Sequence, residues 1–383
     1  MKTVCALNSC TNCKACKDAC PVHAIEIEDN LKAYNAVIDV NKCIECNKCM
    51  TVCQIHSRIQ TQKPIVWKQG WSKNDSVRRK SASGGAATEI MRSFIKNQGI
   101  VCACTFKDGR FAFDFAYEES EIAKFMGSKY VKSDMEGVYH KVKEQLSSGK
   151  KVLFVGLPCQ VAALKKYIGK KQIDGLYTVD LICHGTPSVQ ILKIFLAQNE
   201  MYLEQLHNIR FRKKLCYKDI EDYKEIATTG TCDPYTLGFL KGLFYTENCY
   251  QCQYASTERV SDITLGDSWG SELEEKEGEK GISLVLCQNE KGLTLVRDAE
   301  LDCYDVDVET AVANNHQLRE ASAKHKATDK FFIDIAKGKK FSRTVFECMP
   351  IPYSKQMIKR ILIRSGSLKL RGVAYGIGCL KKK

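Results

Sequence analysis

The pattern of apolar and polar positions predicts alternating strands and helices through the middle of the chain. Residues 151–155 and 176–182 are short apolar runs typical of buried strands, and a segment with helical spacing follows each of them. This order predicts a pair of parallel strands. Cys159 and Cys183 then follow the carboxyl ends of the two strands, the edge at which open sheets of this kind bind ligands.

The pattern near the N-terminus predicts a smaller unit. Residues 24–28 and 36–40 alternate between apolar and polar side chains, which predicts two short strands around a turn near Asp29 and Asn30. Helical spacing returns at residues 86–95. Between these regions, residues 63–80 are polar and basic and predict a linker.

The overall composition is that of a soluble globular protein with two or three domains. The chain has 383 residues, of which 44% are hydrophobic and 27% charged, and no stretch approaches the roughly 18 consecutive apolar residues of a membrane-spanning helix. The N-terminal residues lack the apolar region of a secretory signal, so we expect a cytoplasmic protein.

The cysteines change this picture most. Thiols stay reduced in the cytoplasm, so the 21 cysteines are better explained as metal ligands and small buried hydrophobes than as disulfides. Two runs share the spacing C-x2-C-x2-C-x3-C: Cys10, Cys13, Cys16 and Cys20, and then Cys43, Cys46, Cys49 and Cys53.

This spacing predicts two 4Fe-4S clusters. Three closely spaced thiolates can ligate one cubane, while the fourth cysteine of each run reaches the other cubane. One cluster therefore takes Cys10, Cys13, Cys16 and Cys53, and the other takes Cys43, Cys46, Cys49 and Cys20. Two zinc sites are the alternative, but zinc needs only paired C-x2-C units. Residues 1–60 are similar to bacterial two-cluster ferredoxins, with Gln54 in place of the usual second proline.

Four further cysteines predict a third cluster. Cys249 and Cys252 form a C-x2-C pair before an apparent strand at residues 262–265, and with Cys159 and Cys183 they supply the four thiolates of a cubane. Buried structural cysteines are the alternative. The other nine are expected to be packed hydrophobes: Cys5, Cys102, Cys104, Cys216, Cys232, Cys287, Cys303, Cys348 and Cys379.

The start of the helix at residue 86 is a candidate anion site. Ser83, Gly84 and Gly85 precede it, and free amides of a first helical turn together with the helix dipole can hold a phosphate such as a cofactor pyrophosphate. A plain serine N-cap with a flexible approach to the helix is the alternative.

The ordered motifs resemble the coenzyme F420 hydrogenase/dehydrogenase beta subunit family, an FAD and iron-sulfur oxidoreductase group, with a fused ferredoxin domain. The resemblance covers nearly the whole chain and rests on six segments in the family's order: Ser83-Gly84-Gly85 with Thr88, Gly127-Ser128-Lys129-Tyr130, Gly156-Leu157-Pro158-Cys159, Cys183-His184-Gly185, Cys249-x2-Cys252, and Ser261-Asp262 through Gly270.

The resemblance implies a flavin as well as clusters. In the family, the beta subunit passes a hydride between a deazaflavin carrier and FAD, and single electrons between FAD and clusters. It implies that Lys129 lies beside the isoalloxazine, where a cation stabilises the anionic reduced flavin; an ordinary surface lysine is the alternative. His184 is expected to be a packed histidine or a hydrogen-bond donor near a ligand. The implied cofactor-binding residues are Ser83, Gly84, Gly85, Thr88, Lys129, Tyr130 and Gly156.

Two segments depart from the family pattern. Thr246-Glu247 stand where family members more often show Arg-Pro, and Cys216-Tyr217 replace the Gly-Trp of bacterial members found among cell-surface polysaccharide enzymes. The physiological substrate therefore does not follow from the resemblance, and no catalytic acid or base is assigned.

The net charge of +13 is concentrated in the C-terminal tail. Residues 355–383 contain nine Lys or Arg and no acid, which leaves +4 for the rest and argues against nucleic-acid binding. Met357, Ile358, Ile361 and Leu362 share one helical face, which could rest on an anionic membrane or a partner, or dock on the body of the protein.

These inferences give an α+β and α/β chain, with a bacterial-ferredoxin-like domain before a mixed α/β flavin-binding body. We expect a flavin-dependent iron-sulfur oxidoreductase that exchanges a hydride with an unknown substrate or carrier; the alternative is a non-enzymatic electron-transfer subunit whose redox partner owns the substrate. The expected divisions are a ferredoxin-like domain at 1–62, a linker at 63–80, a flavin-binding region at 81–150, a C-terminal domain with the third cluster at 151–350, and a basic tail at 351–383.

Overall fold

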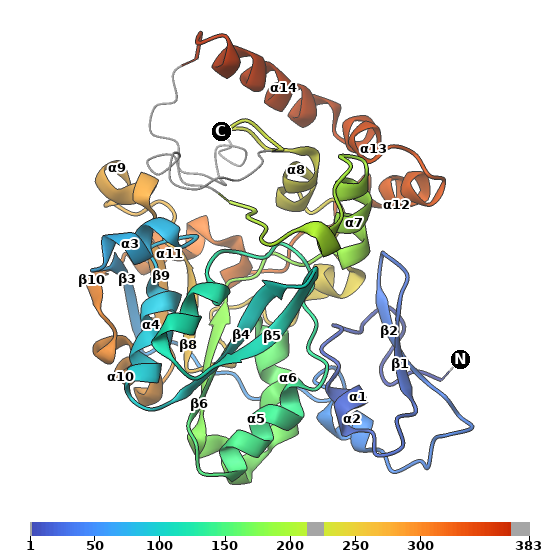
Figure 1. Cartoon of the computed structure of the whole chain (residues 1–383), viewed down its shortest axis with the longest axis vertical. Coiled ribbons are helices and arrows are strands. Elements are labelled where there is room, and N and C mark those ends of the chain that lie inside the picture. Colours follow the sequence, from blue (N-terminus) through green and yellow to red (C-terminus); the bar gives the residue numbers. More distant parts are fainter. Residues whose placement is uncertain (1, 213–225, 369–383) are drawn as a thin grey trace.

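The computed structural model of the chain describes residues 2–212 and 226–368. Cys216-Tyr217, Cys379 and the end of the basic tail lie outside the described residues. Figure 1 shows a small N-terminal module beside a larger body that contains a twisted sheet covered by helices. This arrangement confirms the predicted fold class, a ferredoxin-like module followed by a mixed α/β body.

The N-terminal module is a hairpin with two short helices. Strands β1 (Ile25–Asp29) and β2 (Tyr34–Ile38) pair antiparallel, which confirms the predicted hairpin. Helices α1 (Ala15–Ala19) and α2 (Lys48–Val52) lie within the two cysteine runs and pack against each other.

The body is built on a mixed eight-stranded sheet of order β10-β3-β9-β8-β7-β6-β4-β5. Strands β4, β6, β7 and β8 are parallel neighbours, so the predicted parallel pair is confirmed as β6 and β7. The strands are β3 (Val66–Ser72), β4 (Ile100–Lys107), β5 (Arg110–Ala116), β6 (Val152–Gly156), β7 (Leu176–Leu181), β8 (Ile263–Asp267), β9 (Ser283–Cys287) and β10 (Leu301–Asp305).

Helices cover both faces of the sheet because its strands alternate apolar side chains between them. Leu153 and Val155 of β6 face α4 (Ala86–Lys96) and α10 (Glu290–Asp298). Val152 and Phe154 face the opposite side, against α5 (Val138–Ser147) and α6 (Pro158–Ile168). Ala15 of α1 belongs to this second core, so the N-terminal module packs directly on α6.

The remaining α-helices lie around the end of the sheet where the parallel strands have their carboxyl ends (Figure 1). Helices α7, α8, α12 and α13 share one aromatic core, and α13 contacts α14. Their bounds are α3 (Asp75–Lys80), α7 (Val189–Ala197), α8 (Pro234–Leu240), α9 (Glu274–Glu277), α11 (Val308–Asn314), α12 (Thr328–Ala336), α13 (Phe341–Cys348) and α14 (Pro350–Arg364).

The segment 63–80 differs from the predicted linker, because it contains β3 and α3. β3 pairs with β9 on one side and β10 on the other, inside the sheet. Its polar Gln69 is fully buried, and the amide is satisfied by Ser268, Glu272 and the carbonyl of Asp305. A polar strand is stable at this position because distant partners complete its hydrogen bonds.

Candidate functional site

The two cysteine runs form matching loops. Lys14 and Asn47 occupy the same position in the two runs, and both adopt a left-handed conformation, with φ of 62° and 57°, at the start of α1 and α2. The amide of Asn12 donates to the Cys10 sulfur at 3.4 Å, and the amide of Glu45 donates to the Cys43 sulfur at the same distance. The spacing therefore builds the same local turn twice.

One group of cysteines surrounds a small cavity inside the N-terminal module. Burial raises the pKa of Cys16, and the charges of Cys13, Cys10 and Cys53 raise it further, which reflects how close these sulfurs lie. The group combines three cysteines of the first run with the last of the second. We call it the inner set: Cys10, Cys13, Cys16 and Cys53, all lining one cavity.

A second group lies nearer the solvent. Burial raises the pKa of Cys49, followed by the charges of Cys20 and Cys43, so these three sulfurs are also neighbours. Cys46 is exposed. We call this group, which matches the second crossover prediction, the outer set: Cys20, Cys43, Cys46 and Cys49.

Cys5 is an additional thiol in the inner cavity. Hydrogen bonds to Cys10 and Cys53 raise its pKa, and burial adds to that shift. Its sequence position fits neither run, and the structure packs it beside the inner set.

The third group comes together from three distant segments of the body. Cys159 is the second residue of α6, Cys183 follows β7, and both flank the carboxyl edge of the sheet as predicted. Burial raises the pKa of Cys183 to about 12, and the charges of Cys249 and Cys252 contribute. The charges of the other three thiols likewise act on Cys159. We call these residues the third set: Cys159, Cys183, Cys249 and Cys252.

Hydrogen-bond donors surround Cys249. Burial opposes its ionisation, but the Lys132 ammonium and the Thr246 hydroxyl outweigh that effect and lower its pKa. The Thr246 hydroxyl lies 3.5 Å from the sulfur, and the amide of Thr186 donates to it at 3.5 Å. Such bonds stabilise a thiolate, the form in which cysteine ligates metal.

The donor set fits cubanes better than single ions. Within residues 2–212 and 226–368, no three cysteine, histidine or acidic side chains are placed to hold one metal ion together. A cubane spreads its four thiolates over four irons, whereas zinc draws four ligands around one centre.

The inner set and the third set are joined by buried aromatic side chains. The Tyr139 hydroxyl, on α5, donates to the carbonyl of Cys13 at 2.6 Å. Gln54, next to Cys53, accepts from Tyr254 at 2.5 Å and from Gln253 at 2.6 Å. Tyr254 follows Cys252 by two residues, so the two cysteine sets share one hydrogen-bonded boundary.

The residues predicted to contact a pyrophosphate make contacts within the protein. The Ser83 hydroxyl donates to the carbonyl of Ile282 at 2.9 Å, and the Thr88 hydroxyl lies 3.3 Å from that of Ser81. The N-cap of α4 is Gly85, with φ of 97° and no side-chain cap, rather than a serine. Gly84 lies so close to β3 and β9 that a Cβ there would sit 2.4 Å from the Gly70 carbonyl oxygen.

Lys129, Tyr130 and Gly156 lie elsewhere along the carboxyl edge. The Lys129 ammonium donates to the carbonyls of Phe125 and Met126 at 2.6 and 3.1 Å, and burial lowers its pKa. Tyr130 stacks on Phe239 with ring centroids 4.4 Å apart. Gly156 ends β6. These residues share the edge of the sheet with Ser83 to Thr88.

Two cations near this edge, Arg212 and Lys132, were not among the predicted site residues. Arg212 forms an ion pair with Asp267 at 2.7 Å and lies over the ring of Trp269. Lys132, three residues after Lys129, is only 5% exposed and lies beside the third set. Burial favours its neutral form, yet the charges of Cys249 and Cys159 outweigh this and raise its pKa.

His184 is a packed histidine. Its Nδ1 lies 2.7 Å from the Gln317 amide nitrogen, and its ring meets that of His316 edge to face. Burial lowers its pKa to about 4, with a further contribution from His316, so the ring is neutral at pH 7. This environment matches the expectation from the sequence.

Comparisons with known proteins match three segments of the chain. Residues 9–56 match a 4Fe-4S dicluster domain. Residues 68–139 match the N-terminal domain of the coenzyme F420 hydrogenase/dehydrogenase beta subunit, and residues 149–310 match its C-terminal domain.

Individual relatives are distant. The chain is 24% identical over 248 residues to the F420-dependent formate dehydrogenase subunit beta of Methanocaldococcus jannaschii, a match that spans 60% of this chain and 58% of that protein. A chain from a xenon-derivatised structure of the F420-reducing [NiFe] hydrogenase complex of Methanosarcina barkeri aligns with a TM-score of 0.46 and 18% identity, over 82% of this chain and 97% of that one. With both of its domains behind a 4Fe-4S dicluster domain, the chain belongs to the coenzyme F420 hydrogenase/dehydrogenase beta subunit family.

Proposed function

We propose that this chain is the electron-transfer subunit of an oxidoreductase, with cubane clusters on the outer, inner and third sets and FAD at the carboxyl edge of the sheet. The observation that carries this proposal is the boundary at which Gln54, next to Cys53, accepts hydrogen bonds from Gln253 and Tyr254, which follow Cys252. The sequence of sets leads from an exposed surface into the body.

The cofactors supply the redox chemistry when bound: such clusters take up and release single electrons, and a flavin exchanges electrons singly or in pairs. The protein supplies position and dielectric environment. Cys249 receives hydrogen bonds that stabilise its thiolate, and the buried inner set excludes water. Lys129 provides the cation for a flavin, which requires that its bonds to Phe125 and Met126 exchange for the ligand.

The substrate in this proposal is a deazaflavin carrier of the F420 type, taken from the names of the relatives. A partner subunit then carries the second substrate. The alternative is a complete enzyme that oxidises or reduces its substrate alone. An assay of deazaflavin reduction by the isolated chain separates the two: turnover with an artificial electron donor but none with formate or hydrogen supports the subunit.

Anaerobic purification with iron, sulfide and flavin analysis tests the cofactor content. Three cubanes give about twelve irons per chain, and the proposal expects one FAD. About eight irons without flavin would remove both the third cluster and the flavin, and would leave a ferredoxin-like module on a body of another function.

A contact of α14 with an anionic membrane surface is a separate part of the proposal. None of the helices in the described ranges is both long and apolar enough to span a bilayer. α14 instead exposes an apolar stripe beside Lys355, Lys359 and Arg360, and none of its residues is buried. The exposed apolar residues are Ile351, Met357, Ile358, Ile361 and Leu362.

Co-sedimentation with vesicles tests this contact. We expect the full chain to sediment with vesicles that contain anionic lipid, and the double variant Ile358→Glu, Ile361→Glu to stay in solution. Equal sedimentation of the two proteins would remove the membrane contact.

A further inference from the structure

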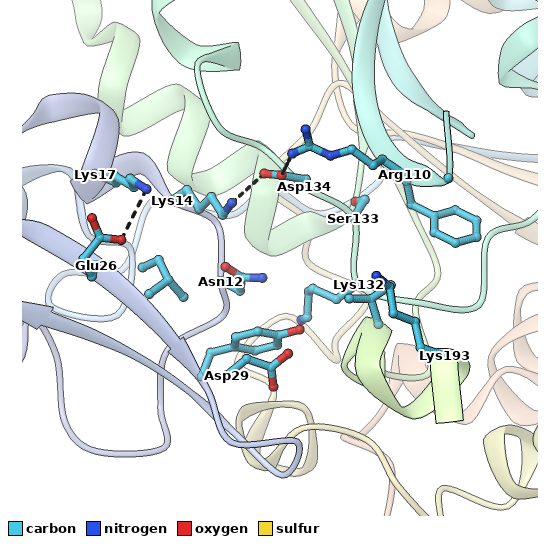
Figure 2. A pocket seen from close by; sticks show the side chains of 15 residues that line it. Asn12, Lys14, Lys17, Glu26, Asp29, Arg110, Lys132, Ser133, Asp134 and Lys193 are labelled. Atoms are coloured by element: carbon cyan, nitrogen blue, oxygen red, sulfur yellow. Dashed lines mark hydrogen bonds and ion pairs between the residues drawn. The ribbon is translucent and has the colours of Figure 1, made fainter. Parts of the chain in front are cut away.

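A cavity of about 280 Å³ lies between the N-terminal module and the body. Figure 2 shows that its side chains come from both sides, with Asn12 and Asp29 from the module and Lys132 and Ser133 from the body. The charged side chains at its rim are paired. Lys14 and Arg110 bind Asp134 at 2.7 and 2.9 Å. Lys14 and Lys17 also pair with Glu136, Lys17 pairs with Glu26, and Lys193 pairs with Glu204.

Lys132 is the exception among the cations that line this cavity. Its side chain is buried, and its ammonium makes no hydrogen bond or ion pair with any residue that the structure describes. In Figure 2 it extends from the body toward the side of the cavity where Asn12 and Asp29 lie. A buried ammonium without a carboxylate partner needs another source of negative charge.

The backbone around Lys132 is fixed to the segments that carry the third set. Its amide donates to the carbonyl of Pro187 at 3.0 Å, and the neighbouring Thr186 amide donates to the Cys249 sulfur. The adjacent Ser133 hydroxyl accepts from Gln160, which directly follows Cys159, at 3.0 Å. These bonds hold Lys132 beside the third set whatever the state of the side chain.

The other end of the cavity belongs to the inner set. Asn12 lies between Cys10 and Cys13 and donates its amide to the Cys10 sulfur. Tyr34 also lines the cavity, and its backbone pairs with that of Cys10. The charge of Lys132 acts on the thiol of Cys10 as well as on those of Cys159, Cys183 and Cys249. Lys132 therefore lies within electrostatic reach of both sets.

We infer that Lys132 is a shared counter-ion for the inner and third clusters, which stabilises the reduced form of each and makes it less unfavourable for both to be reduced together. The inference rests on the proposed third cluster. Each cluster gains negative charge when it takes an electron, so a fixed cation between two clusters raises both potentials. The groups that act on Cys49 of the outer set are Met50, Cys20 and Cys43, so we use the outer cluster as the internal reference.

Potentiometric titration of the anaerobically purified full chain, followed by EPR, tests this inference. We expect Lys132→Met to lower the midpoint potentials of two clusters and to leave the third unchanged. Lys132→Arg, which keeps the charge, should remain close to wild type. Lys193→Gln is the matched control, because Lys193 lines the same cavity but is only half-buried and is paired with Glu204.

The outcomes are distinct. Wild-type chain with about eight irons and two EPR signals would overturn the third cluster, and with it this inference. About twelve irons and unchanged potentials in Lys132→Met would overturn the role of Lys132 alone. If Lys132→Met loses iron while Lys132→Arg retains it, the charge is required and the inference stands. Equal loss from both variants would show that the position, rather than its charge, matters, and would overturn it.

Discussion

The inner and outer sets have the same spacing in sequence but different surroundings in the structure. Their loops share the left-handed residue before the short helix and the amide bond to the first sulfur. The inner cysteines are nonetheless all buried, whereas Cys46 of the outer set is exposed and Cys43 and Cys49 are partly so. Local spacing therefore determines the loop, and tertiary packing determines the environment of the cluster.

The surroundings also suggest different roles for the two sets. The inner set packs on α5 and α6, where Tyr139 bonds to Cys13. The outer set is bordered by exposed apolar residues, namely Val40, Ile44 and Met50. Solvent exposure and hydrogen bonds to sulfur are among the factors that set cluster potentials, so we expect the two potentials to differ. A protein that exchanges electrons with this chain would therefore contact the outer set first.

The sharpest test of this difference replaces one cysteine in each set. Cys16→Ser and Cys46→Ser should each lose about four irons. We expect only Cys16→Ser to lose stability as well, by about 1–3 kcal/mol, because Cys16 is buried and the hydroxyl of the introduced serine would lie there without the cluster. Iron analysis and urea unfolding measure the two effects. Equal destabilisation by both variants would contradict the distinction between a buried and an exposed set.

The next test removes a contact that only the first run makes with the body. Lys14 binds Asp134 at 2.7 Å and Glu136 at 3.0 Å, across a partly buried boundary. Lys14→Met should cost about 1–3 kcal/mol, because hydrogen bonds between charged groups are lost. The control is Lys48→Met, within the second run. Limited proteolysis should release the module faster from Lys14→Met alone; similar rates in both variants would count against the docking contact.

A smaller effect is expected from acid. Burial would raise the pKa of Asp134, but Lys14 and Arg110 outweigh it and hold the pKa below its usual value. A carboxyl whose pKa is lower in the folded than in the unfolded protein stabilises the fold at pH values above its unfolded-state pKa. This stabilisation is lost as the pH falls through its folded-state pKa. In brief pH jumps between pH 5 and pH 3, monitored by tryptophan fluorescence, Lys14→Met should lose less stability than the wild type as the pH falls. If Lys14→Met and the wild type have identical pH profiles, the ionised Asp134 does not stabilise the contact between the module and the body.

The smallest effect is expected at Cys5. This thiol lines the inner cavity but is not among the four predicted ligands. Cys5→Ala should therefore keep the iron content of the wild type, with at most a small change in the EPR signal of the inner cluster. A loss of about four irons would make Cys5 a ligand and would require a new assignment of the inner set.

Regular local patterns were the part of the molecule that the sequence predicted best. The hairpin, α4, β6 and β7 follow from short-range apolar periodicity, and the crossover of Cys20 and Cys53 follows from cluster geometry. The third set was predictable only as a count of thiolates near strand ends. Its assembly depends on chain segments that are distant in sequence.

The features that the sequence did not predict have a common physical cause, because they depend on polar contacts between residues far apart in the chain. Lys68, Gln69 and Gly70 have the composition of a linker, yet they lie in β3, between β10 and β9, because Ser268 and Asp305 satisfy the buried amide of Gln69. Lys132 likewise resembles any other lysine until the cysteines around it are known. In both cases residues from other segments of the chain make burial tolerable: Ser268 and Asp305 for Gln69, and the third set for Lys132.

The position of β3 has a consequence for how the protein is made. This strand leaves the ribosome directly after the cluster-binding module, but both of its neighbours, β9 and β10, are synthesised near the end of the body. This end of the sheet must therefore remain incomplete during most of translation, because β3 has no strand to pair with until β9 and β10 are made. We expect the N-terminal loops to have time to acquire iron before the sheet closes beside them.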